Sequence, residues 1–214
     1  YRGGTGEIIE KKSRFIAEVY PIESEEQATQ ILEETRKKYW DARHHCWAYV
    51  LGRNPAAERM SDDGEPAGTA GKPILEVIRG RKLTDVLVIV TRYFGGTLLG
   101  TGGLVRAYTS AAIDGLEHSE SITRIHGIKL LIRAEYTDLG KIQYLLASRD
   151  VIQLDPVYTD KVELTALVPV EQIKGLKADL MEGTNGQAVL DETLQCWFAQ
   201  TEDGIRIFSE WVEE

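Results

Sequence analysis

The residues best suited to chemistry lie in a glycine-rich segment, residues 92–106, which begins at Arg92 and ends at Arg106. Its glycines allow positive φ angles and a close approach of the backbone to a ligand; they are Gly95, Gly96, Gly100, Gly102 and Gly103. A helix that starts here would present free N–H groups, and the two arginines would bracket this anion site. The spacing matches neither the Walker A loop nor the dinucleotide-binding GxGxxG. A tight turn that packs a helix against a strand is the competing interpretation.

A second polar segment, residues 59–73, is long enough for a functional loop. Asp62, Asp63 and Glu65 supply carboxylates of the kind that Mg²⁺ or Ca²⁺ prefers, but the EF-hand spacing is absent. Because adjacent acidic residues commonly just solvate a loop, we predict no metal and no cofactor here. Lys72 precedes Pro73, where a helix is expected to begin, and it adds a cation beside the loop.

A third segment, residues 44–49, combines histidine, cysteine and aromatic residues. Alternation in a strand places His44 and Cys46 on one face and His45 on the other, together with the aromatic rings that follow it. A buried structural cysteine is favoured over a nucleophilic Cys–His pair, since free cysteine is among the most buried residue types. The face of His45, Trp47 and Tyr49 could be an aromatic platform for a peptide or for unstacked bases, or simply half of a core.

The elements around these segments predict an α/β unit in the first half of the chain. Lys12 and Arg14 lie on the outward face of its first strand. Residues 24–27 form a capping box for a helix, and five consecutive aliphatic residues mark a central strand covered on both faces. The expected order is a strand at 12–22, a helix after Ser24, a strand at 45–51, a polar loop at 52–71, a short helix near Pro73, a strand at 86–90 and a helix after Gly103.

The second half predicts a separate βαββαβ unit, which is the ferredoxin-like arrangement. Its expected elements are a strand at 128–134, a helix that Thr137 caps, a hairpin of 151–158 and 162–168, a helix that carries Ile173, Leu176, Leu180 and Met181, and a strand at 188–198. The tail with Ile205, Ile207 and Trp211 is expected to pack back on it. We therefore predict an α+β protein with domains at residues 1–126 and 127–214.

Composition and charge narrow the function classes. The chain has 214 residues, is 43% hydrophobic and carries a net charge of −9. Residues 1–126 hold 17 basic and 18 acidic side chains, and residues 127–214 hold 8 and 16, so the second half carries −8 of the total. A surface for an anion or a nucleic acid is therefore expected in the first half. The polar start, the lack of a bilayer-length apolar run and two cysteines far apart favour a cytoplasmic, non-membrane protein.

Six motifs occur in order through the first half, at residues 12–15, 42–49, 61–66, 68–73, 92–96 and 100–108. Together they resemble the IMPACT family, of the bacterial YigZ/YvyE type. The resemblance implies a first domain like the second domain of ribosomal protein S5 and a ferredoxin-like second domain. It also implies relatives in eukaryotes that regulate translation by binding a partner in the amino-acid starvation pathway. It supplies no catalytic residues.

Taken together, these observations predict a non-catalytic regulatory protein, associated with translation, that binds a ribosome, RNA or a translation-related protein. The residues expected to bind the partner or an anion are Arg92, Gly95, Gly96, Gly102, Gly103, Arg106, Lys72, Asp62, Asp63, Glu65, Lys12, Arg14 and His45. The alternative is an enzyme that acts on a phosphorylated small molecule or nucleotide, with Arg92, Arg106 and Lys72 holding the phosphate.

Overall fold

The computed structural model describes residues 2–52 and 56–208. The chain divides into two compact units, Tyr1–Ser121 and Ile122–Glu214. Each has its own antiparallel sheet and its own buried core. The two-domain α+β class expected from the sequence is confirmed.

The first unit is built on a five-stranded sheet with the order β1-β2-β5-β3-β4, in which every neighbouring pair is antiparallel. The strands are β1 (Thr5–Glu10), β2 (Ser13–Pro21), β3 (His44–Leu51), β4 (Ala57–Ser61) and β5 (Val86–Tyr93). Strand β5 occupies the centre and is buried from Val86 to Arg92, as its aliphatic run predicted.

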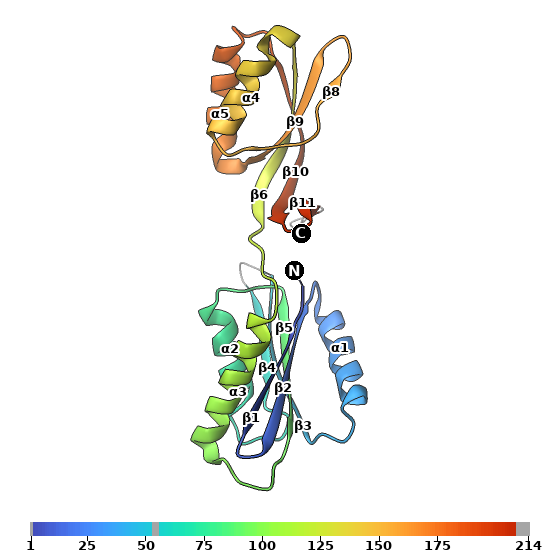
Figure 1. The fold of residues 1–214 in the computed structure, drawn as a ribbon, viewed down its shortest axis with the longest axis vertical. Coiled ribbons are helices and arrows are strands. Elements are labelled where there is room, and N and C mark those ends of the chain that lie inside the picture. The colour runs from blue at the N-terminus through green and yellow to red at the C-terminus, as the bar shows by residue number, and fades with distance from the viewer. Residues whose placement is uncertain (1, 53–55, 209–214) are drawn as a thin grey trace. The chain divides into compact units, whose positions relative to one another are not determined.

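Helices cover both faces of this sheet (Figure 1). Helix α1 (Glu25–Lys38) lies on one face, while α2 (Gly71–Gly80) and α3 (Gly100–Glu117) lie side by side on the other. Phe15, Ala17 and Val19 of β2 point into the core beneath α2 and α3. Burial of each large apolar side chain contributes about 1.5–3 kcal/mol. The cores on the two faces of the sheet therefore hold the strands in place, and with them the ends of the loops that connect the strands.

The start of α1 confirms the predicted cap. Ser24 Oγ accepts a hydrogen bond from the N–H of Gln27 at 3.2 Å. The Gln27 side chain reaches back to the N–H of Glu23 at 2.8 Å, one residue earlier than in a standard capping box.

Strand β4 corrects the expectation of an irregular loop over residues 52–71. It pairs with β3 along the edge of the sheet, from Trp47 opposite Ser61 to Leu51 opposite Ala57. Its residues Glu58, Arg59 and Met60 are exposed. An edge strand with this little burial shows almost no hydrophobic alternation, so the sequence pattern did not reveal it.

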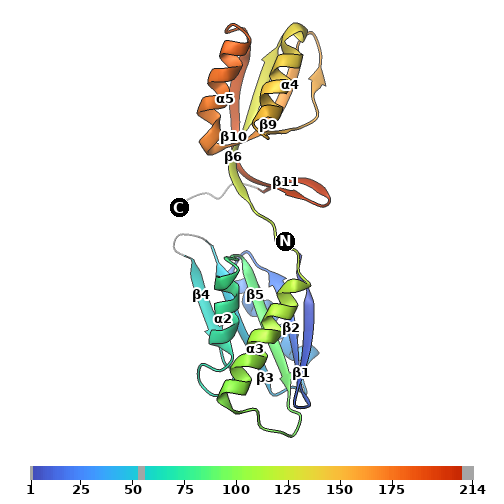
Figure 2. The ribbon, with the colours of Figure 1, turned by 60° about the vertical axis from the view of Figure 1, so that its left-hand side comes forward.

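The second unit has the strand order β11-β10-β6-β9-β7, with β8 paired to β9. The elements are β6 (Ile125–Ala134), η1 (Tyr136–Asp138), α4 (Leu139–Ser148), β7 (Ile152–Gln153), β8 (Val157–Tyr158), β9 (Val162–Pro169), α5 (Val170–Gly183), β10 (Val189–Thr201) and β11 (Gly204–Phe208). Helices α4 and α5 cover one face of the sheet (Figure 2). The elements follow the predicted βαββαβ ferredoxin-like arrangement, with the strand expected at 151–158 divided into β7 and β8 and with β11 added after β10.

Two details of this unit differ from expectation. Thr137 lies inside the η1 turn, and α4 begins after Asp138 without a side-chain cap. Met181 is 40% exposed, so it lies outside the buried stripe of α5. Ile205 and Ile207 lie on β11, which pairs with β10, whereas Trp211 lies outside the described residues.

Candidate functional site

The polar segments of the first unit meet at one end of its sheet. We call this the loop end: the β1–β2 turn (residues 10–13), the segment before β3 (39–43), the segment between β4 and α2 (62–70), and the segment from β5 into α3 (94–103). Figure 1 shows these connections at the same end of the unit, opposite the chain's start. The two polar loops of the sequence are therefore brought together.

Asp62 fastens the start of α2. One carboxylate oxygen accepts hydrogen bonds from the N–H groups of Ala70 at 3.0 Å and Gly71 at 2.8 Å, and the other accepts one from Gly68 at 2.8 Å. Partial burial alone would raise the pKa of Asp62, but these N–H groups outweigh it and hold the pKa below its ordinary value. The anion position at this helix start is thus filled by the protein's own carboxylate.

Asp63 ties the same loop to the edge of β3. Its side chain accepts a hydrogen bond from the N–H of His45 at 2.7 Å and pairs with Arg36 of α1 at 2.9 Å. Its carbonyl oxygen lies 2.9 Å from Nδ1 of His44, and its φ of 41° is in the left-handed region. Aspartate tolerates that backbone conformation better than most residues, so this residue type suits the sharp turn of the loop.

Glu65 connects this loop to the elements on both sides of the glycine-rich segment. Its Oε1 lies 2.6 Å from Arg92 Nη1, and the two side chains are 4% and 7% exposed. The hydroxyl of Tyr108 in α3 donates to the same oxygen at 2.8 Å. The Arg92 guanidinium also lies over the rings of Phe15 and Phe94, at 5.4 and 5.7 Å. One buried carboxylate therefore links the 62–70 segment to both β5 and α3.

Cys46 lies beneath this network as a thiol. Its Sγ is 3.0 Å from the carbonyl oxygen of Asp62 and 3.3 Å from the Tyr108 hydroxyl. Burial is the main cause that raises the pKa of Cys46 to about 12. A thiol of this kind is a poor nucleophile at neutral pH, so the predicted structural role fits its surroundings.

The glycine-rich segment is shaped by contact with the β1–β2 turn. The N–H of Gly95 donates to Ser13 Oγ at 3.1 Å, and a Cβ at Gly95 would lie 2.1 Å from the carbonyl carbon of Lys12. Glycine is therefore required at this position by close approach. Helix α3 begins at Gly100, so Gly102 and Gly103 lie inside its first turn instead of preceding it. Leu99 precedes the helix and provides no side-chain cap.

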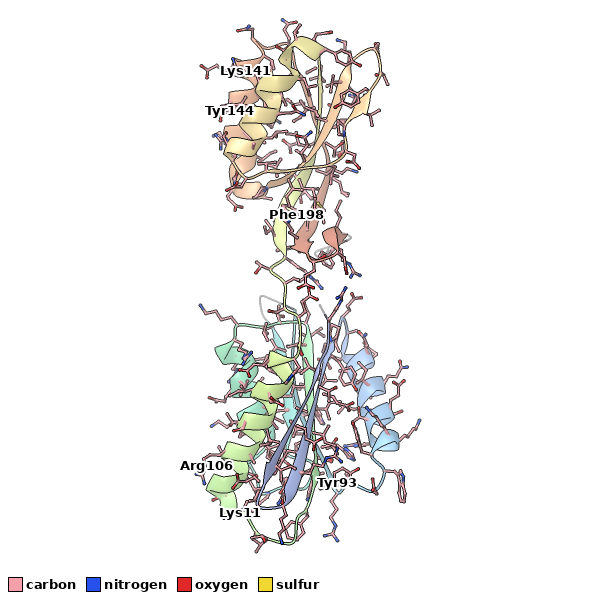
Figure 3. All side chains as sticks on the ribbon, in the orientation of Figure 1. Lys11, Tyr93, Arg106, Lys141, Tyr144 and Phe198 are labelled. Carbon is pink, nitrogen blue, oxygen red and sulfur yellow. The ribbon has the colours of Figure 1, made fainter. Side chains whose placement is uncertain are left out.

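The basic residues of the loop end fall into two groups. Arg92 is buried against Glu65, and Arg14 makes two hydrogen bonds of 2.8 Å to Glu7. By contrast, five exposed side chains form no hydrogen bond or ion pair with any part of the chain that the structure describes: Lys11, Lys12, Arg43, Lys72 and Arg106. Figure 3 shows Lys11 and Arg106 at the loop end, together with Tyr93.

Both units of the chain match known protein families. The Impact N-terminal domain matches residues 11–116, and a domain of unknown function, DUF1949, matches residues 132–187. The IMPACT family member YvyE of Bacillus subtilis is 38% identical over 189 residues, which is 88% of this chain and 87% of that protein. The chain belongs to the IMPACT family. The member YigZ of Escherichia coli is 36% identical over 182 residues, which is 84% of this chain and 89% of that protein.

A solved structure also matches nearly the whole IMPACT-family chain. It is described only as a crystal structure of an hypothetical protein, and it is 34% identical with a TM-score of 0.55. The match covers 90% of this chain and 96% of the other. Both domains of this family member thus recur together in another folded protein.

The His45 face of this IMPACT-family protein is part of the interior. His45 is 5% exposed, and its Nδ1 lies 3.1 Å from Thr91 Oγ1. Burial is the main cause that lowers its pKa. Trp47 and Tyr49 stack with ring centroids 5.7 Å apart and pack with the cluster under α1. This face is therefore not open as an aromatic platform, and it forms part of the hydrophobic core, which was the other interpretation of the sequence.

The three carboxylates of the 62–65 segment face different partners. Asp62 faces backbone N–H groups, Asp63 faces Arg36, and Glu65 faces Arg92. No group of three or more His, Cys, Asp or Glu side chains in the described ranges is arranged to hold a metal ion. Over the same ranges, none of the helices has the length and apolar character needed to cross a bilayer.

Lys11 and Leu98 are surface residues of the loop end that the sequence reasoning missed. Lys11 lies beside Lys12 in the turn, and both have positive φ angles, of 46° and 69°. Leu98 is 83% exposed between the glycines. For Lys11 the signal is the type of turn, because the two residues between paired strands must project outward, whatever their chemistry. Leu98 lies in the connection from β5 to α3, and no such pattern marks it.

Proposed function

We propose that this IMPACT-family protein is a non-catalytic regulatory binding protein, associated with translation, whose partner contacts the loop end of the first domain. One observation carries this proposal. The two loops are fastened from beneath by Glu65, Arg92 and Tyr108, while basic side chains on their outer surface have no partner within the described chain. A rigid support with unengaged charges above it is suited to binding.

The charge distribution supports the same location. Four acidic side chains in or beside the loops are engaged internally: Asp41 accepts from the Tyr93 hydroxyl at 2.8 Å, Asp62 caps α2, Asp63 pairs with Arg36 and Glu65 pairs with Arg92. Glu10 of the β1–β2 turn is exposed. No acidic residue occurs in the sequence from residue 86 to residue 113. An otherwise acidic chain therefore concentrates free positive charge at one end of its first domain, where it attracts an anionic partner.

The alternative, an enzyme that acts on a phosphorylated small molecule or nucleotide, has less support. Its phosphate-holding residues were to include Arg92, which is paired with Glu65. An assisting carboxylate would have to come from Asp62 or Asp63, and both have internal partners. Arg106 and Lys72 remain exposed, but exposed cations alone support binding rather than turnover.

The association with translation comes from the family resemblance, because the geometry supports a binding surface but indicates no pathway. We propose a ribosome, RNA or a translation-related protein as the partner, and the cytoplasm as the place of action. Contacts with such partners would be screened by salt, since the free groups are surface cations.

Co-sedimentation with ribosomes from cell extract tests this function. The full chain is compared with Lys11→Glu/Arg106→Glu, which reverses two exposed charges at the loop end. We expect wild type to pellet with the ribosomal fraction or with a large complex, and the double variant to lose about tenfold in binding, in line with the typical energy of a few surface contacts. The same assay at raised salt should weaken wild-type binding.

Lys82→Glu is the matched control. Lys82 is also an exposed lysine of the first unit, but it follows α2 at the end away from the loops. It should bind as wild type does. Equal binding by wild type and the loop-end double variant, with both folded, would show that the loop end does not contact the partner.

A further inference from the structure

The loop end exposes large apolar side chains among its cations. Leu98 is 83% exposed, Phe94 is 52% exposed, and Trp40 in the segment before β3 is 82% exposed. The Tyr93–Asp41 hydrogen bond of 2.8 Å joins the segments that carry Phe94 and Trp40. Single exposed apolar residues are common on protein surfaces. Several of them on adjoining loops indicate a protein-binding surface.

The apolar side chains are held out by their surroundings. Phe94 cannot turn inward, because the Arg92 guanidinium lies against its ring at 5.7 Å and Arg92 is fixed by Glu65. Leu98 stands between glycines with positive φ, at Gly96 and Gly100, where the backbone turns sharply. Leu99, the next residue, packs against the core and leaves Leu98 pointing away from it. The exposure therefore follows from the framework.

Cations surround these apolar groups with few competing anions. Lys11 and Lys12 lie in the turn that contacts Gly95, and Arg106 lies in the second turn of α3, with its Nη1 near Gly102. The carboxylates of the neighbouring loops are bound internally, which leaves Glu10 as the exposed acidic residue of the turn. A partner segment would thus meet net positive charge around an apolar centre.

These features favour a protein partner over RNA. Leu98 and Trp40 are exposed to nearly the same extent, 83% and 82%. Trp40 has a ring on which a base could stack, whereas Leu98, which lies in the glycine-rich segment, has none. The inner face of the Phe94 ring is covered by Arg92. The chain as a whole carries a net charge of −9, which opposes a long polyanion but affects a short acidic segment less.

We infer that the loop end receives an acidic segment of a protein that carries apolar anchor side chains, which contact Leu98 and Phe94 while its carboxylates pair with Lys11, Lys12 and Arg106. This inference rests on the proposed function and specifies its partner. Protein interfaces usually have hydrophobic anchor residues at the centre and charged residues at the rim.

Site-specific photo-crosslinking in living cells tests the inference. The full chain carries p-benzoylphenylalanine in place of Leu98, or in place of Lys82 as the control position. The crosslinked products are treated with nuclease or protease, and the attached peptides are mapped by mass spectrometry. We expect protein products from position 98 whose mapped segments are rich in Asp and Glu and contain large apolar residues. Crosslinking should fall about tenfold when Lys11→Glu/Arg106→Glu is added.

Each outcome decides the question. Nuclease-sensitive products at position 98 would overturn the acidic-segment inference but leave the loop end as a binding surface. Mapped segments without an acidic excess would also overturn it, with the same consequence. Products no different from those at position 82 would overturn both the inference and the proposed function. A Leu98→Asp variant, which alters an exposed side chain and keeps the fold, should lose binding if the acidic segment docks as inferred.

Discussion

Glu65 and Arg92 form an ion pair with a separation of 2.6 Å between Oε1 and Nη1, in a place where neither side chain is more than 7% exposed. The pair joins two residues that are 27 positions apart in sequence, one in the segment between β4 and α2 and the other near the end of β5. Its position beneath the loop end explains how exposed cations and apolar side chains can be held in fixed places. The first prediction follows from this pair.

Glu65→Ala should lower the free energy of unfolding by about 3–5 kcal/mol, because it leaves a buried guanidinium without its charge partner. The double variant Glu65→Leu/Arg92→Met should recover much of that loss, since removing both charges removes the desolvation cost as well. Urea unfolding measures both changes. Glu7→Ala is the control, because the Glu7–Arg14 pair is exposed and should contribute little. Equal stability of wild type and Glu65→Ala would contradict the structural role given to the pair.

Asp62 should contribute a stability that depends on pH. Its folded-state pKa is lowered, so the contribution is present above the ordinary pKa of aspartate, about 3.9, and is lost as the pH falls through the lower folded-state value. Asp62→Ala should cost about 1–2 kcal/mol at pH 7, as expected for a helix cap. The difference in unfolding midpoint between variant and wild type should shrink below about pH 4. A difference in unfolding midpoint that grows as the pH falls would contradict a lowered pKa of Asp62 in the folded state.

Cys46 should resist alkylation in the native protein. With a pKa of about 12 and no exposed surface, its thiolate fraction at pH 8 is on the order of one in 10⁴. Iodoacetamide should label it slowly when the protein is folded and rapidly in denaturant, as followed by mass spectrometry of the peptide that contains residue 46. Rapid native labelling would show that the network around Tyr108 opens readily.

Limited proteolysis should separate the two units. The compact units meet between Ser121 and Ile122, and residues 121–124 have no regular secondary structure. We expect early cleavage within residues 118–127, followed by two fragments that each unfold cooperatively. Progressive loss of one half without a stable fragment would mean that this half depends on the other for its fold.

The sequence revealed the elements whose residues carry a strong local pattern. The aliphatic run of β5 and the Ser24 cap of α1 each have a single physical explanation, and the structure has both. Strand β4 was missed because Glu58, Arg59 and Met60 are exposed on an edge. The residue type of Thr137 predicts a helix cap, but Thr137 lies inside a 3-10 turn that precedes the helix.

The site was harder to predict, because the partner of a charged residue depends on tertiary structure. The sequence placed Arg92 beside a glycine-rich loop and suggested an exposed anion site, but it could not show that Glu65 folds back over it. For the same reason His45 looked available in an alternating strand, although it is buried in the structure with its Nδ1 3.1 Å from Thr91 Oγ1. Convergence of the two loops also depends on the strand order, which places β5 between β2 and β3.

Lysine footprinting locates the bound surface most directly. The full chain is acetylated under mild conditions, alone and with the ribosomal or protein fraction that it binds, and the extent of modification at each lysine is measured by mass spectrometry. The account predicts that the partner protects Lys11, Lys12 and Lys72 at the loop end, while Lys82 and Lys141 react as in the free protein. Protection of Lys141 in the second domain, with the three loop-end lysines unchanged, would contradict it.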